Sequence, residues 1–221
     1  EGDKKGAREM MNRSLKVAAL IAIPSALGLS VMAKPVLSIL FKNKESVEMA
    51  SPLLSVLAIS VFFLGMLSVT NAMLQATKHE RLPIISMVVG ACVKMISSFV
   101  LIGIKGVEMY GAPIGTFLCY FTITLINFIF LGKKVGMIPD FKEVFIKPFF
   151  SSCICVLSAF FMYKVFSVKG NLIATLGAIV IAVIVYLCAI FLIKAITKED
   201  ILMLPGGKKI YSILNKLKIM K

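Results

Sequence analysis

The sequence has few of the residues from which catalytic centres are built. It contains a single histidine, His79, and eleven acidic residues, and every acid lies outside the long apolar stretches that dominate the chain. The H-E-x-x-H, G-x-S-x-G and P-loop motifs are all absent, so the metal, serine and phosphate-binding chemistries that they supply have no basis here. The segment is therefore predicted not to be an enzyme and to need no cofactor.

The five cysteines do not form a pattern typical of a metal site or a disulfide framework. All of them lie within apolar stretches, and Cys153 and Cys155 form a C-x-C pair with no second pair and no nearby histidine to complete a zinc set. Cysteine in such surroundings is usually a small apolar packing residue. No metal site and no disulfide are predicted.

Long apolar stretches are what the sequence has in abundance. The chain is 59% hydrophobic with a mean hydropathy of +0.95, whereas soluble domains are roughly 45–50% apolar. A transmembrane helix needs about 20 mostly apolar residues. Six stretches have this length, at residues 15–41, 52–76, 83–104, 111–131, 144–166 and 172–193. The predicted fold is an all-α polytopic membrane protein, with its six transmembrane helices arranged as three antiparallel hairpins.

The basic residues alternate between successive loops. The segments before the first stretch and after the second, fourth and sixth carry 18 lysines and arginines, and the opposite loops carry 5. By the positive-inside rule, this difference predicts that both ends of the chain are cytoplasmic. The net charge of +14 is not gathered into one patch with interleaved aromatics, so no nucleic-acid partner is predicted.

Polar segments divide the chain into five predicted parts. These are a cytoplasmic lead-in at 1–14, a four-helix unit at 15–131, a cytoplasmic linker at 132–143, a terminal helix pair at 144–195 and a basic cytoplasmic tail at 196–221. The chain begins without methionine and without a signal peptide. We therefore expect the interior of a longer polypeptide, and a trimmed form of a complete six-span protein is the alternative.

Lys94 is the most polar point within the apolar stretches. A charge near the centre of a span costs about 2.5–3.5 kcal/mol on insertion scales, so it should face protein or water. The residues that share its helical face form a polar stripe: Ser86, Gly90, Ser97 and Ser98. Lys94 is either a cavity-lining cation for an anionic substrate group or a structural lysine that bonds between helices. The other candidates for a polar cavity are Asn71, Gln75 and Asn127.

Small residues and prolines suggest where helices pack closely or bend. Close helix packing is expected at Gly65, Gly90, Gly111 and Gly115, of which the last two form a G-x-x-x-G motif. Pro24 and Pro35 lie in the first stretch and are expected to bend it. Broken helices recur in transporters, although proline is also ordinary in membrane helices.

Several runs of sequence resemble signature spans of the flippases for polysaccharide and peptidoglycan lipid precursors. They are ALIAIPSALGLSVMAKPVLSILF at 19–41, NAMLQATK at 71–78 with PIISM at 83–87, and YGAPIGT at 110–116. These flippases belong to the multidrug/oligosaccharidyl-lipid/polysaccharide superfamily, and the chain most resembles its stage V sporulation protein B-like and MurJ-like branch. The resemblance is good over residues 10–135 and looser beyond.

The resemblance implies that the chain is a carboxy-terminal fragment. Family members have fourteen spans, as two six-helix lobes and a final pair, and the six stretches correspond to spans nine to fourteen. The family's pyrophosphate-binding arginines lie mainly in the missing amino-terminal lobe and have no counterpart here, and the pair at 144–193 would line a groove for the lipid tail. Two departures are Lys34, where a carboxylate is common, and Ala76, where glycine is usual.

The function implied is that of a flippase in the plasma membrane of a bacterium. It would export lipid-linked polysaccharide or peptidoglycan precursors by alternating access, with Lys94, Asn71 and Gln75 lining this lobe's side of the cavity. Its partners would be the polyprenyl-linked glycan, membrane lipids and the missing amino-terminal lobe. Two alternatives stay open: a multidrug/cation antiporter of the same superfamily, which would need an intramembrane carboxylate that these spans lack, and a non-transporting membrane scaffold.

Overall fold

The computed structural model describes residues 2–136, 138–166 and 170–193, and within these ranges the chain forms helices and turns without any β-strand. Six helices are long and apolar enough to cross a membrane: α1 (Gly2–Val31), α3 (Lys44–Ala76), α4 (Arg81–Ile102), α5 (Gly111–Phe130), α6 (Lys147–Phe166) and α7 (Asn171–Leu192). Helices suit this role because the backbone must satisfy its own hydrogen bonds in lipid. The predicted all-α, six-span fold is confirmed.

Four shorter elements connect the spans: α2 (Ala33–Leu40), the 3₁₀ turn η1 (Glu108–Tyr110) and the π-helical turns η2 (Leu131–Val135) and η3 (Lys142–Ile146). The start of α3 is capped by Asn43, whose Oδ1 accepts a hydrogen bond from the Glu45 amide at 3.0 Å. Gly136 ends η2 with a φ of 74°, a left-handed conformation that glycine adopts without strain.

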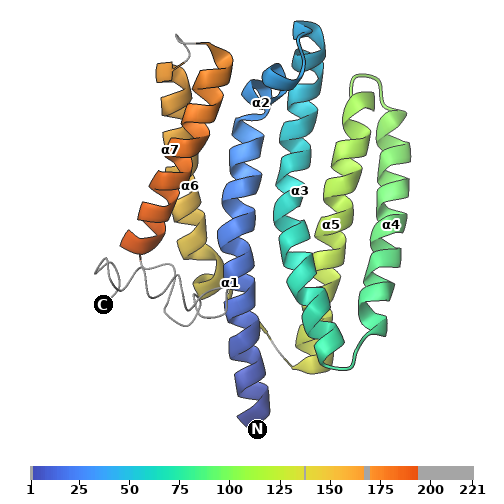
Figure 1. The fold of residues 1–221 in the computed structure, drawn as a ribbon. Helices are drawn as coiled ribbons and strands as arrows, with labels where there is room; N and C mark the ends of the chain where they lie inside the picture. Colours follow the sequence, from blue (N-terminus) through green and yellow to red (C-terminus); the bar gives the residue numbers. More distant parts are fainter. Residues whose placement is uncertain (1, 137, 167–169, 194–221) are drawn as a thin grey trace.

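The spans stand side by side in a row (Figure 1). The pairs that pack most extensively are α1 with α3, α4 with α5, and α6 with α7, which are the three predicted hairpins. Contacts of α3 with α5, and of α1 with α6, join these hairpins to one another. As a result, α1 and α3 occupy the centre of the row, α4 forms one edge, and the α6–α7 pair forms the other.

One end of the bundle gathers the N-terminus, the α3–α4 turn and the linker between α5 and α6 (Figure 1). We call it the basic end, because it holds the lysine- and arginine-rich segments of the described chain. Contacts across the sequence fix this grouping. Arg8 Nε donates to the Ile138 carbonyl at 3.0 Å, and the Asp140 amide donates to Asn12 Oδ1 at 3.2 Å.

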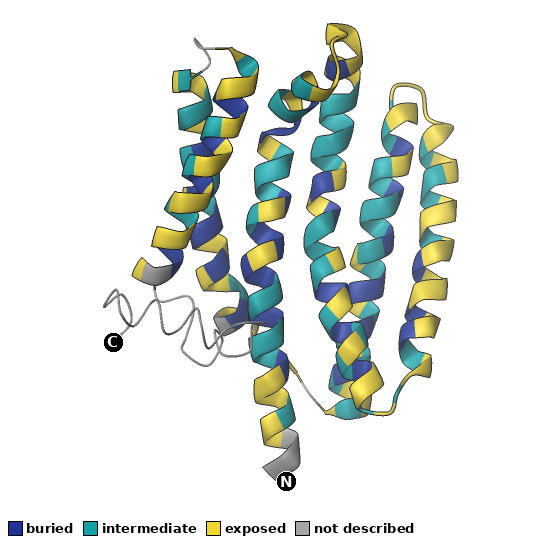
Figure 2. Cartoon of the chain, in the orientation of Figure 1, coloured by how far each residue is buried: buried dark blue, intermediate teal, exposed yellow. Residues whose placement is uncertain are grey.

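The main core is built around a stripe on α1 in which buried residues recur every four positions. It consists of Met11, Leu15, Ala19 and Ile23, packed against Met66 and Leu74 of α3 and against Leu131 and Val144 of the linker. Figure 2 shows buried residues distributed through α1, α3 and α5, whereas α4 is exposed along much of its length. Only 11% of the most apolar part of α4 is buried. This helix therefore leaves most of its apolar surface uncovered within this chain.

Some predicted boundaries differ from the structure. The expected lead-in at 1–14 is part of α1, which runs without a break from Gly2 to Val31. The first predicted span, 15–41, is divided at Met32, and Pro35 lies in the first turn of α2, where its missing N–H removes no helical bond. The linker predicted at 132–143 overlaps η2 and η3. The tail at 196–221 and the last two residues of the pair at 144–195 lie outside the described residues.

Candidate functional site

A buried cluster of polar side chains joins three helices around Asn127 of α5. The Asn127 side chain is fully buried, and its Nδ2 donates to Thr70 Oγ1 at 3.1 Å and to Asn71 Oδ1 at 2.7 Å, both on α3. Its Oδ1 accepts a hydrogen bond of 2.6 Å from Ser86 Oγ on α4. Both amide hydrogens and the carbonyl are therefore used within the protein. This Asn127 cluster connects α3, α4 and α5.

Lys94 and Gln75 lie away from the Asn127 cluster. Lys94 is eight residues beyond Ser86 on α4, and its side chain is exposed. Gln75 is one turn beyond Asn71 on α3 and is also exposed. The structure thus brings Asn71 and Asn127 together but joins neither to Lys94 or Gln75.

The four glycines singled out in the sequence all lie at helix contacts. A Cβ atom added at Gly65 would lie 2.8 Å from Ala22 Cβ of α1, and one at Gly111 would lie 2.8 Å from Ile102 Cγ1 of α4. Added at Gly90, it would lie 2.7 Å from Ile123 Cδ1, and at Gly115 it would come within 3.3 Å of the Lys94 carbonyl. Much of the polar stripe on α4 therefore faces α5.

The two prolines of the first predicted span have different surroundings. Pro24 lies inside α1, and the helix continues through it to Val31. Pro35 follows the break at Met32, where the backbone has a φ of −95° and a ψ of 13°. Beside Pro35, the Lys34 ammonium lies 3.4 Å from Glu48 Oε1 of α3, with the two side chains 64% and 68% exposed. A pair so exposed contributes little stability.

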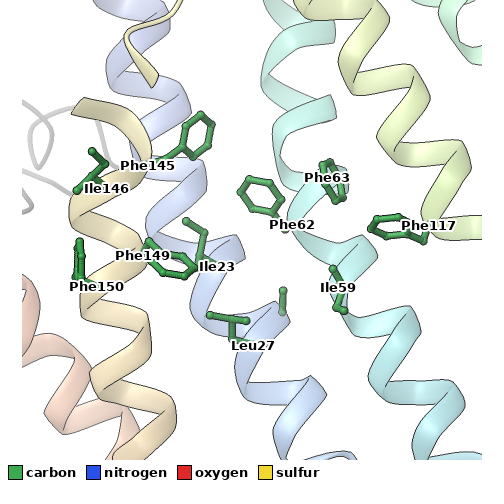
Figure 3. A pocket seen from close by; sticks show the side chains of 11 residues that line it. Ile23, Leu27, Ile59, Phe62, Phe63, Phe117, Phe145, Ile146, Phe149 and Phe150 are labelled. Carbon is green, nitrogen blue, oxygen red and sulfur yellow. The ribbon is translucent and has the colours of Figure 1, made fainter. Parts of the chain in front are cut away.

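An apolar pocket of about 490 Å³ lies between α1, α3, α5 and the segment that begins α6 (Figure 3). Its lining residues are all hydrophobic, and six of them are phenylalanines: Ile23, Ala26, Leu27, Ile59, Phe62, Phe63, Phe117, Phe145, Ile146, Phe149 and Phe150. We call this the phenylalanine pocket. Such a lining suits a hydrocarbon chain and offers no group for a charged ligand. The resemblance implies a lipid groove along the terminal pair, and residues 145–150 of that part line this pocket.

Aromatic contacts connect the linker at the basic end to this pocket. Ring centroids are 5.6 Å apart for Phe128 and Phe141, 5.9 Å for Phe141 and Phe145, and 5.8 Å for Phe145 and Phe62. These spacings are typical of favourable aromatic pairs. Sequence reasoning missed this series, because Phe62 and Phe145 are far apart in the chain and no local pattern connects them.

A second hollow, of about 450 Å³, lies on another side of α1, between α1–α2 and the α6–α7 pair. Its lining is also largely apolar and includes Pro24, Gly28, Ala159, Ala182 and Tyr186. We call it the α7 hollow. Among residues 2–136, 138–166 and 170–193, no group of three or more His, Cys, Asp and Glu side chains is placed to hold a metal ion.

Comparison with known proteins gives one family match and two related proteins. Residues 1–100 match the protein-family model described as MatE. The chain is 24% identical over 217 residues to the uncharacterized membrane protein YabM of Bacillus subtilis (strain 168). This alignment covers 95% of this chain and 39% of YabM. It is 25% identical over 138 residues to the lipid II flippase MurJ of the same organism. This second alignment covers 61% of this chain and 25% of MurJ. No solved structure gives a significant match.

The MatE match covers α1, α2, α3 and most of α4, and together with the six apolar helices it indicates a multi-pass membrane protein. The chain spans about two fifths of the length of YabM and a quarter of that of MurJ. The assignment to the stage V sporulation protein B-like branch stays a prediction.

Proposed function

We propose that this chain is the carboxy-terminal part of a bacterial flippase that moves polyprenyl-linked glycans, precursors of polysaccharide or peptidoglycan, across the plasma membrane by alternating access. The observation that carries this proposal is the phenylalanine pocket, found in a chain that is similar to a lipid II flippase. The basic end would face the cytoplasm, in keeping with the positive-inside rule.

The chemistry of the pocket favours a hydrocarbon chain over a cationic drug. A cation would need a carboxylate, and all eleven acidic residues lie outside the six predicted spans. Lipid tails are as apolar as the pocket, so burial of apolar surface alone gives little preference between bilayer and protein. Binding would instead depend on packing against the rings of residues such as Phe62, Phe145 and Phe149.

Lys94 would act on the polar part of the substrate. Its exposed ammonium lies within a helix that has most of its apolar surface uncovered, and in hydrocarbon such a charge is costly. In the proposed transporter the exposed side chain of Lys94 borders the cavity between the lobes, where Lys94 would attract the substrate pyrophosphate, and Gln75 would supply a hydrogen bond. Asn71 and Asn127 would hold the helices that shape the cavity.

The pocket can be tested by filling it. Ile59→Trp adds a large ring to the pocket lining, and Ile84→Trp makes the same change on α4, away from the pocket, where Ile84 is 62% exposed. We expect crosslinking of a photoreactive polyprenyl phosphate to fall at least fivefold in Ile59→Trp and to stay at the wild-type level in Ile84→Trp. Equal crosslinking of the two variants would remove the phenylalanine pocket from the mechanism.

A further inference from the structure

The first span has a missing backbone hydrogen bond that another helix replaces. Pro24 has no N–H, so it cannot donate to the Leu20 carbonyl four residues earlier, as a regular helix would require. The hydroxyl of Tyr186 on α7 donates to this same carbonyl oxygen. A bond that α1 cannot make within itself is therefore made by a residue 166 positions away in the sequence.

A second set of bonds holds the segment beyond the break at Met32. Asn171, the first residue of α7, donates from Nδ2 to the Pro35 carbonyl at 3.3 Å and to Ser38 Oγ at 2.7 Å, both on α2. Its Oδ1 accepts a hydrogen bond of 2.9 Å from the Tyr163 hydroxyl on α6. Asn171 thus connects α2 to both helices of the terminal pair.

Between these two attachments the contact is interrupted by the α7 hollow. Asn171 and Tyr186 are fifteen residues apart, or roughly 22 Å along a helix. The space between them is lined in part by small residues, namely Gly28 on α1, Ala159 on α6 and Ala182 on α7. Small side chains leave about 450 Å³ unfilled here, and the contacts of α7 with α1 and α2 lie at the two ends of the hollow: the bonds of Asn171 at one end, and at the other the bond of Tyr186 with the packing of Ile190 on Leu20.

We propose that α7 is a clamp on the first span. Tyr186 holds α1 where Pro24 leaves the Leu20 carbonyl without its helical donor, and Asn171 holds α2 beside Pro35. Release of these bonds lets α7 move away from α1, while the contacts between α1 and α6 keep the terminal pair attached. The bonds are between uncharged groups, so the clamp can open and close without a titration step. The clamp goes beyond the proposed transport activity, and its test does not depend on transport because the quantity measured is a distance between helices.

The clamp predicts a specific coupling between Tyr186 and Pro24. Tyr186→Phe removes only the hydroxyl, and Pro24→Ala restores an amide N–H that can bond to the Leu20 carbonyl within α1. The helix separation can be measured in the full chain in lipid nanodiscs, by electron paramagnetic resonance between unnatural spin-label residues at Leu57 of α3 and Leu176 of α7, both exposed.

We expect Tyr186→Phe to increase the ratio of separated to closed molecules by about three- to tenfold, the effect of one hydrogen bond. In the Pro24→Ala background the same change should shift this ratio less than twofold. Tyr120→Phe is the matched control, because the Tyr120 hydroxyl makes no hydrogen bond among the described residues, and it should leave the distances unchanged. Asn171→Ala tests the second attachment and should also favour separation. Unchanged distances in Tyr186→Phe, or equal shifts with and without Pro24, would overturn the clamp.

Discussion

Replacing Asn127 by alanine tests whether the buried polar cluster holds the four-helix unit together. The substitution removes three side-chain hydrogen bonds, to Thr70, Asn71 and Ser86. The three partners respond differently. Ser86 Oγ keeps the Pro83 carbonyl as an acceptor at 2.9 Å, so its hydroxyl is not left unpaired. Thr70 Oγ1 and Asn71 Oδ1 each lose the hydrogen bond that they accept from the Asn127 amide.

The size of the effect follows from these contacts. Side-chain hydrogen bonds between membrane helices contribute about 0.6 kcal/mol each on average, so three of them account for about 2 kcal/mol. Asn127 is fully buried, and the space left by its side chain adds a further loss of packing. We expect Asn127→Ala to lower the free energy of unfolding by about 2–3 kcal/mol.

The assay is reversible unfolding in mixed micelles, titrated with a denaturing detergent. Ser97→Ala is the matched control on the same unit, because Ser97 makes one hydrogen bond of 3.2 Å to the Lys94 carbonyl within its own helix. It should change the free energy of unfolding by less than about 0.5 kcal/mol. If Asn127→Ala fell within that same range, the cluster would not be what joins α3, α4 and α5.

Three further predictions use the same helices. Gly90→Ala should destabilise the protein by more than about 1 kcal/mol in the same titration, since the added Cβ would press on Ile123. Gly28→Ala is the control, because a Cβ added at Gly28 meets nothing within 4 Å, and it should be neutral or stabilising. Equal losses of stability in the two variants would contradict the packing role of Gly90. Lys94→Leu should leave the free energy of unfolding unchanged or higher while slowing glycolipid translocation about tenfold or more. Lys94→Arg keeps the charge and should retain activity. Unchanged transport in Lys94→Leu would remove Lys94 from the mechanism. In intact cells, a cysteine at Glu80 should be protected from an impermeant maleimide and one at Lys105 should react; the reverse pattern would invert the topology.

The fold was largely predictable because membrane-spanning helices are specified by apolar length. The six spans and their hairpin pairing follow from the spacing of apolar stretches and basic loops, and the structure confirms the six-span all-α fold. The extent of α1 was not predictable in this way, because the polar residues before Leu15 carry no apolar signal and are nevertheless compatible with a helix. Pro24 and Pro35 predicted a bend in the first span, and the structure has a break at Met32, which lies between them.

The side-chain arrangement was less predictable, since it depends on contacts between distant parts of the chain. Asn71 and Asn127 were candidates for a polar cavity, and the structure pairs them with each other within the protein. Lys94 shares a helical face with Ser86, but it lies far enough along α4 to stay outside their cluster. The phenylalanine pocket and the bond from Tyr186 to the Leu20 carbonyl depend on which helices become neighbours. The only local signal for the latter was Pro24, whose missing N–H leaves a carbonyl without its usual partner.

The most direct test of the proposed function is a translocation measurement on the protein expressed from its intact gene and reconstituted in vesicles. One set of vesicles would contain a fluorescent polyprenyl-pyrophosphate-linked disaccharide, and a second set would be loaded with a cationic dye. The flippase account predicts protein-dependent movement of the glycolipid to the opposite leaflet and no efflux of the dye. Dye efflux without movement of the glycolipid would contradict it and would favour a cation antiporter.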